Sequence, residues 1–171
     1  MEKIHAVKTS LFGKGSIALL PDELKKRGLT RGLIVTDSFL YKSGAADRVG
    51  ACLLMAGLEY AVYYLVQPNP TVQVVEECLK AADALEVDVL VAVGGGSAID
   101  TAKAVSIVLA NGGHVKDYEG VGKSGKPGIP IVAVNTTAGT GSEVTSFYIV
   151  TNSDTHSKMC MVDTNCMVTI A

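Results

Sequence analysis

The chain has 171 residues, 48% of them apolar, and its 15 basic and 17 acidic residues give a formal net charge of −2. That length suits one domain with a substantial core and is too short for two ordinary domains. No basic cluster stands out, so the charge pattern gives no reason to expect nucleic acid as a partner. No apolar run reaches the ~20 residues of a membrane helix, and the opening residues lack an apolar signal core. We therefore expect no membrane contact, a cytoplasmic location and a small-molecule ligand.

Apolar patterning predicts strands that alternate with helices. Helices are expected over 17–26 and 39–56, from Val72 onward with Thr71 as the capping residue, and between Ser97 and Leu109. Strands are expected over 32–36, 60–66, 87–93 and 129–134, with a polar loop over 111–128. The last third of the chain, 145–151 and 158–162 about a turn at 152–154, is typical of a β-hairpin.

Strands that are apolar throughout indicate a parallel sheet covered on both faces. We therefore predict the α/β class: a Rossmann-like parallel sheet with helices on both faces plus a C-terminal β-hairpin, in one domain of residues 1–171. Ligands of such sheets lie at the carboxyl ends of the strands. The segments that directly follow strands should therefore share one rim, and they are Asp37, 68–70, 94–97 and 135–137.

Three glycines and a serine, Gly94, Gly95, Gly96 and Ser97, stand between a predicted strand and a predicted helix. Glycines permit positive φ and close approach of a ligand, and the free N–H groups at a helix start attract phosphate. Ser97 could cap the helix or donate its hydroxyl to a phosphate oxygen. The run matches neither the Rossmann G-x-G-x-x-G pattern nor a P-loop, so an ordinary glycine-rich connection stays open as the alternative.

Further polar residues follow the predicted strands or occupy the phosphate helix. Thr136, Thr137, Thr140 and Thr145 belong to a hydroxyl-rich segment suited to ribose, diphosphate or carboxamide, although a solvated turn would look similar. Asp37 could accept two ribose hydroxyls and repel a 2′-phosphate, which favours NAD over NADP, or could serve as an ordinary N-cap. Asp100 could contact the reacting end of a cofactor or merely compensate the helix dipole. Lys103 reads as a solvated helix residue, and Lys158 as a ribose or phosphate contact or a solvated strand lysine.

The cysteines and histidines show no metal-ligand spacing. The four cysteines form no C-x-x-C pair, so we expect reduced thiols and no zinc site: Cys52, Cys78, Cys160 and Cys166. The three histidines are scattered and receive no catalytic role: His5, His114 and His156.

Five motifs together resemble the amino-terminal half of an iron-containing (group III) alcohol dehydrogenase, in the style of the 1,3-propanediol dehydrogenase and lactaldehyde reductase branch. They are Phe12-Gly13-x-Gly15-Ser16, Val35-Thr36-Asp37, Pro68-Asn69-Pro70, Gly94-Gly-Gly-Ser-x-x-Asp100-Thr-x-Lys103 and Thr136-Thr-Ala-Gly-Thr-Gly-Ser-Glu-Val-Thr145. The resemblance covers essentially the whole chain and implies a reversible, NAD-dependent hydride transfer between a small alcohol or diol and its aldehyde or ketone. In that family a divalent metal, usually Fe²⁺, polarises the substrate oxygen.

The resemblance also implies roles for individual residues. Asp37 would hold the adenosine ribose, Asn69 would lie near adenine, and Gly95, Gly96 and Ser97 would cradle the diphosphate. Asp100 would approach the nicotinamide, the four threonines would line the cleft, and Lys158 would touch the nicotinamide ribose. The family's metal ligands, one aspartate and three histidines, belong to a helical domain expected beyond Ala171.

We therefore expect this chain to bind NAD without turning over substrate, and we expect a homo-oligomer. A stand-alone nucleotide-binding or regulatory module and a glycerol dehydrogenase-like relative stay open as alternatives. A reading frame that continues into helices bearing aspartate and histidine would favour the enzyme over the module.

Overall fold

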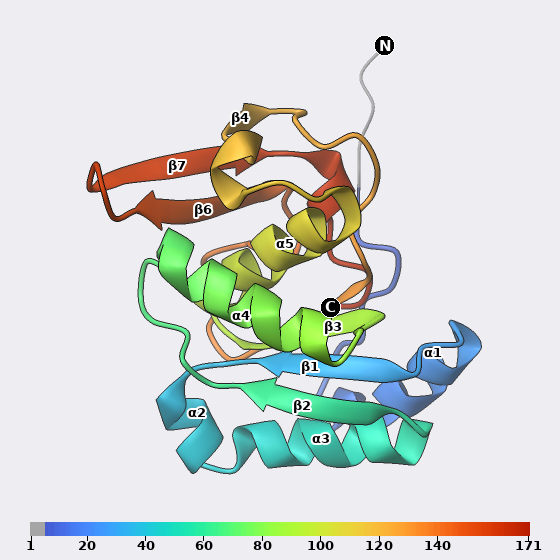
Figure 1. Ribbon diagram of the computed structural model, residues 1–171. Coiled ribbons are helices and arrows are strands. Elements are labelled where there is room, and N and C mark those ends of the chain that lie inside the picture. The colour runs from blue at the N-terminus through green and yellow to red at the C-terminus, as the bar shows by residue number, and fades with distance from the viewer. Residues whose placement is uncertain (1–5) are drawn as a thin grey trace.

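Four parallel strands form the main sheet, in the order β2-β1-β3-β5 (Figure 1). They are β1 (Arg31–Val35), β2 (Glu59–Tyr63), β3 (Val89–Gly94) and β5 (Ile131–Asn135). This computed structural model describes residues 6–171, so Met1–His5, on which the expectations about the opening residues and His5 rest, lie outside the described residues. The predicted parallel sheet is confirmed.

Helices cover both faces of this sheet, as predicted. α1 (Leu20–Lys26) and α3 (Ala45–Ala56) pack on one face, and α4 (Val72–Ala84) and α5 (Gly96–Asn111) on the other. Successive strand residues alternate between the two cores, because side chains along a strand point to opposite faces. Ile34 joins the α1/α3 core, whereas Leu33 and Val35 join the α4/α5 core. Within residues 6–171, no helix combines the length and apolarity needed to cross a bilayer.

A second, three-stranded sheet lies on the far side of α5 (Figure 1). The predicted hairpin supplies β6 (Phe147–Asn152) and β7 (Ser157–Val162), which pair antiparallel. The short β4 (Gly120–Val121) joins β7 in parallel. Because α5 lies between two sheets, every residue from Ala98 to Val108 is buried except Asp100, which is half-buried. This position explains why apolar residues occur on all sides of the helix.

Two of the predicted helices are each divided in the structure. The helix expected over 39–56 is α2 (Ser38–Lys42) followed by α3, separated at Gly44, which has a left-handed φ of 76°. The helix expected over 17–26 begins as a 3₁₀ turn, Ser16–Leu19, before α1. Pro21 lies in the first turn of α1, where its missing N–H costs no hydrogen bond.

Other predicted boundaries also differ. The strand expected over 87–93 is Val89–Gly94, and the hairpin strand expected over 145–151 is Phe147–Asn152. The strand expected over 60–66 ends at Tyr63, because its partner β1 already ends at Val35. The strand expected over 129–134 begins at Ile131, directly after Pro130. The loop expected over 111–128 contains β4 and a 3₁₀ turn, Val115–Tyr118, whose first and last side chains are buried. A reciprocal capping box between His114 and Asp117 stabilises that turn.

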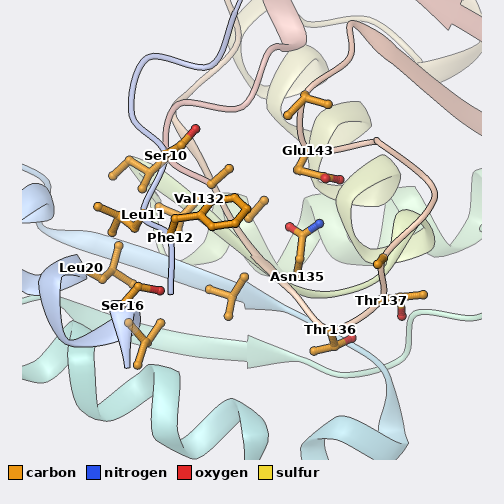
Figure 2. A pocket seen from close by; sticks show the side chains of 17 residues that line it. Ser10, Leu11, Phe12, Ser16, Leu20, Val132, Asn135, Thr136, Thr137 and Glu143 are labelled. Atoms are coloured by element: carbon orange, nitrogen blue, oxygen red, sulfur yellow. The ribbon is translucent and has the colours of Figure 1, made fainter. Parts of the chain in front are cut away.

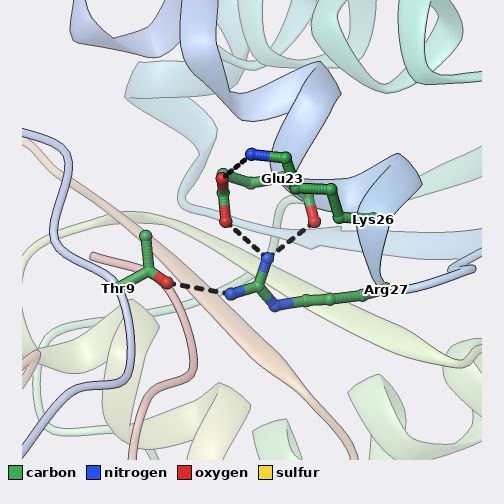
Figure 3. A network of polar contacts seen from close by, with 4 residues as sticks. All are labelled: Thr9, Glu23, Lys26 and Arg27. Atoms are coloured by element: carbon green, nitrogen blue, oxygen red, sulfur yellow. Dashed lines mark hydrogen bonds and ion pairs between the residues drawn. The ribbon is translucent and has the colours of Figure 1, made fainter.

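Residues 169–171 run beside the far edge of β5, and the segment before α1 runs alongside them. Leu11 N–H donates to the carbonyl of Ala171, and Ile170 bridges to Val132 in β5. Arg27 ties this segment to α1, because its guanidinium donates to Thr9 Oγ1 at 2.9 Å and to Glu23 Oε2 at 2.6 Å (Figure 3). The main sheet is therefore flanked at β5 by ordered chain.

Candidate functional site

The strand order reverses between β1 and β3, because β2 lies on one side of β1 and β3 on the other. In open α/β sheets such a reversal leaves a crevice at the carboxyl ends of the two strands, where ligands bind. Asp37 follows β1, and the glycine bend (residues 94–97) begins at the end of β3. Because all four strands are parallel, Asp37, residues 94–97 and residues 135–137 share one rim, as predicted. Residues 68–70 do not directly follow their strand, because β2 ends at Tyr63, and Pro70 instead accepts a hydrogen bond from Thr151 in the hairpin.

A buried threonine holds the strand ends together beneath the crevice. Thr36 Oγ1 donates to the carbonyl of Val93 at 2.8 Å, and Thr36 N–H donates to the carbonyl of Tyr63. The start of α2 lies beside the bend, since a Cβ placed on Gly94 would lie 3.6 Å from Leu40 Cδ1. The two sides of the reversal are therefore fixed close together.

The glycine bend presents the start of α5 without a side-chain cap. Gly94 has a φ of 154°, and a Cβ there would lie 2.9 Å from the Cβ of Ala98. Gly95 is the N-cap residue and Ser97 lies inside α5, so of the two roles considered for Ser97 the helix cap is wrong. Ile99 donates to the Gly95 carbonyl, and the helix offers no acceptor to the amides that precede Ile99. These amides and the helix dipole together favour an anion.

The threonine-rich segment (residues 136–145) lies against the glycine bend. Thr136 N–H donates to the Gly94 carbonyl at 3.0 Å. A Cβ on Gly95 would lie 3.1 Å from Thr137 Oγ1, and a Cβ on Gly96 would lie 3.2 Å from Thr140 Cγ2. The side chains of Thr136, Thr137 and Thr140 are exposed, and Thr145 is half-buried. Hydroxyl groups and backbone donors thus face one another across the start of α5.

Asp37 caps α2, as one of its two readings predicts. Its Oδ1 accepts from the amides of Phe39 at 2.8 Å and Leu40 at 2.9 Å. Both bonds go to the same oxygen, and the residue stays partly exposed. The cap therefore fixes the carboxylate at the reversal while its second oxygen can accept hydroxyl groups.

Asp100 lies under the hairpin. Its Oδ2 accepts from the Ile149 amide at 3.1 Å, and its Oδ1 is buried with no hydrogen-bond partner among the described residues. Burial raises the pKa of this carboxyl, while the Ile149 amide and the charge of Lys103 oppose the rise. A ligand could reach the buried oxygen only if neighbouring atoms moved.

The prediction that Lys103 is solvated is wrong. Its side chain is fully buried, and its Nζ donates to the carbonyls of Ser142 and Thr145 at 2.6 Å and of Phe147 at 2.8 Å. Burial lowers the pKa of this ammonium, and the nearby carboxylates of Asp100 and Glu143 oppose that effect. In the sequence its immediate neighbours are small and apolar, which is a signal of burial but does not indicate its partners.

Asn69 and Lys158 each lie next to Thr151, near the turn of the hairpin. The Asn69 carbonyl accepts from Thr151 Oγ1 at 3.5 Å, and Thr151 pairs with Lys158 across β6 and β7. Both side chains are exposed. No hydrogen bond joins either residue to the glycine bend within the described part of the chain, so this pair forms a separate part of the rim.

A cavity of about 510 Å³ lies on the other side of β5, between that strand and the segment before α1 (Figure 2). Thr136 and Thr137 line it, but the glycine bend and Asp37 do not. Glu143 also lines it, and its Oε2 is buried without a partner among residues 6–171. The sequence did not predict this cavity, although the Phe12-Gly13-x-Gly15 motif borders it.

Residues 6–171 bring together no group of three or more histidine, cysteine, aspartate or glutamate side chains that could hold a metal ion. The four cysteines are free thiols.

Comparisons with known proteins agree with this geometry. The chain is 41% identical to the NAD-dependent methanol dehydrogenase of Bacillus methanolicus over 95% of its length, and 42% identical to the lactaldehyde reductase of Escherichia coli K12 over 91%. A crystal structure of a 1,3-propanediol oxidoreductase superimposes on 99% of the chain with a TM-score of 0.95 at 35% identity.

These matches cover 42%, 41% and 44% of the respective relatives, so the chain spans about two fifths of their length. The sequence model of the iron-containing alcohol dehydrogenase family matches residues 8–171, which is nearly the whole chain. The ordered motifs, the parallel sheet and the glycine bend thus have one common explanation: the chain belongs to the iron-containing alcohol dehydrogenase family.

Proposed function

We propose that this chain binds NAD(H) across the carboxyl rim of its parallel sheet, as the cofactor domain of a metal-dependent alcohol dehydrogenase. The domain comprises residues 1–171. One observation carries the proposal: the uncapped start of α5 lies at the strand-order reversal and faces a segment rich in hydroxyl groups. A diphosphate is the ligand group that such a helix start attracts, and hydroxyl donors suit the adjoining ribose and carboxamide.

Each candidate residue has a part in this proposal. Asp37 binds the adenosine ribose, Asn69 lies on the adenine side, and the diphosphate lies on Gly94, Gly95, Gly96 and Ser97. Asp100 approaches the nicotinamide, Thr136, Thr137, Thr140 and Thr145 line the cleft, and Lys158 approaches the second ribose. The buried Oδ1 of Asp100 requires a small shift of the segment above it before a ligand can reach it.

The glycines fit this cofactor. The space above Gly95 and Gly96 is so narrow that a Cβ would contact Thr137 and Thr140. Because the two glycines carry no side chain of their own, their backbone donors stay uncovered for a diphosphate. When bound, NAD supplies the nicotinamide that accepts or returns hydride, and the protein supplies binding and orientation.

The reaction proposed for the whole protein is the reversible oxidation of a small alcohol or diol to its aldehyde or ketone. The family description supports iron, or another divalent metal, for that protein. Residues 6–171 provide no cluster of metal ligands, so none of them is proposed to hold that metal. We also propose that the protein forms a homo-oligomer, and that this chain alone binds cofactor without catalysing turnover.

Calorimetric titration of the purified chain with NAD and NADP tests the binding proposal. The expected result is one NAD site per chain and weaker binding of NADP. Absence of NAD binding by the folded chain would contradict the proposal. Reduction of NAD by the chain with a simple alcohol and a divalent metal would contradict the proposed lack of turnover.

A further inference from the structure

The face of α5 that carries Gly96, Asp100 and Lys103 lies against the second sheet and the threonine-rich segment. These three positions are spaced i, i+4 and i+7, which places them on one side of a helix. Gly96 lies against Thr140 and Ser142, Asp100 accepts from Ile149, and Lys103 donates to Ser142, Thr145 and Phe147. Residues 140–149 therefore contact α5 through one continuous stripe.

The Lys103 ammonium is the strongest of these attachments. An ammonium has three N–H donors, and all three hydrogen bonds of Lys103 go to backbone carbonyls within residues 140–149. Hydrogen bonds from a charged donor are shorter and stronger than neutral ones. No single side chain of residues 140–149 determines the attachment, since the acceptors belong to the backbone.

We propose that Lys103, with Asp100, is a positioning residue that docks residues 140–149 on α5 and so holds the threonine-rich segment over the glycine bend. This inference rests on the proposed binding of NAD in that crevice. Lys103 lies two turns beyond the phosphate site on the same helix, and from there it fixes the shape of the crevice. Lys103 itself touches neither phosphate nor substrate.

Lys103→Met tests the docking, because methionine keeps a similar length and volume but donates no hydrogen bond. The control is Ser106→Ala on the same helix, which removes the buried bond from Ser106 Oγ to the Ile129 carbonyl at 2.7 Å. Ser106 is also fully buried, but its partner lies outside residues 140–149. A general loss of stability should therefore appear in both variants, and release of the segment only in the first.

The first readout is amide hydrogen exchange of residues 140–149 in the chain without ligand. We expect exchange to accelerate at least about tenfold in Lys103→Met relative to Ser106→Ala, because the unpaired carbonyls turn toward water. The second readout is affinity for NAD and for adenosine. NAD binding should weaken at least about tenfold in Lys103→Met, and adenosine binding, which relies on the Asp37 side and involves no phosphate, by less than about twofold.

Unchanged exchange in Lys103→Met would overturn the inference and leave the proposed function intact. Faster exchange with unchanged NAD affinity would overturn the positioning role. A wild-type chain that binds no NAD would contradict the proposed function and, with it, the cofactor part of this inference, while the exchange arm would still decide the docking. If Lys103→Met does not fold, Asp100→Ala tests the docking instead. The Ile149 amide should then exchange faster, and an unchanged exchange rate at Ile149 would contradict the docking.

Discussion

Asp37 combines a charge with a helix cap, and the two effects can be separated. Asparagine retains a side-chain oxygen for the amides of Phe39 and Leu40 but carries no charge. We expect Asp37→Asn to narrow the preference for NAD over NADP by about tenfold, because a 2′-phosphate is no longer repelled, with little change in stability. Calorimetric affinities for the two dinucleotides check the first expectation, and urea unfolding the second.

The control is Asp37→Ala, which removes charge and cap together. It should narrow the preference similarly and lower the free energy of unfolding by about 1 kcal/mol. An unchanged ratio of affinities in Asp37→Asn would count against a ribose contact at this residue.

Gly95 tests the glycine bend. Its φ is −94°, so alanine is allowed there, but the added Cβ would lie 3.1 Å from Thr137 Oγ1 and within the proposed diphosphate site. Gly95→Ala should weaken NAD binding at least about tenfold while stability changes by less than about 1 kcal/mol. Calorimetry and thermal unfolding provide the two measurements.

Gly125→Ala is the matched control, since a Cβ there meets only Asn111 Oδ1 at 3.7 Å. It should bind NAD like the unmodified chain. Equal affinity in both variants would argue against a phosphate on the bend.

The sequence predicts the role of a residue when its contacts are with neighbours in the chain. The glycine bend follows from neighbours in the chain, and so does the cap at Asp37, which remained one of two readings. Lys103 could not be predicted, because its acceptors lie 39, 42 and 44 residues further along the chain. Only the folded chain places those carbonyls around it.

Gly44 separates two helices that apolar periodicity alone would join. Its φ of 76° is left-handed, a conformation that costs most residues roughly 1–2 kcal/mol. We expect Gly44→Ala to lower the free energy of unfolding by about 1 kcal/mol, and Gly44→Asn to lower it less, because asparagine tolerates this conformation better. Urea unfolding measures both, and equal losses would show that the left-handed turn is not the cause.

The main elements were predictable from pattern and several of their ends were not. Buried strands and the stripe of α4 follow from the spacing of apolar residues. β4 is two residues long and exists only because β7 lies beside it, so no local pattern marks it. The same holds for the strand end at Tyr63, which the length of β1 determines.

Alkaline pH should destabilise the whole molecule through buried acids that ionise only after unfolding. Burial raises the pKa of Cys166 to about 11 from an ordinary value of 9.0, and it also raises the pKa of Cys78 and Tyr148. Above pH 9 the unfolded chain loses these protons first, so the free energy of unfolding falls as pH rises. A shift of that size corresponds to about 2–3 kcal/mol for Cys166 between pH 9 and 11.

Lys103 contributes to the pH dependence of stability with the opposite sign, because burial lowers its pKa and the unfolded chain then holds that proton more tightly. Urea unfolding between pH 7 and pH 11 measures the sum. Cys166→Ala should flatten the decline relative to Cys160→Ala, which replaces an exposed thiol. Identical slopes in the two variants would refute this assignment.

The sequence pattern predicted the class of the sheet but not the order of its strands. Local patterns show that strands and helices alternate, whereas the order β2-β1-β3-β5 depends on which crossover passes β1. That order places Asp37 and the glycine bend on either side of the reversal. It also leaves the 510 Å³ cavity beyond β5 as a separate space.

Amide chemical shifts recorded while NAD is added to the isotope-labelled chain therefore test the central claim most directly. The amides of Gly95, Gly96 and Ser97 should move together with those next to Asp37 and Thr137, because the diphosphate lies on the start of α5. Shifts that gather instead around Phe12, Val132 and Ile170, with the glycine bend unmoved, would place the dinucleotide in the other cavity and contradict the account.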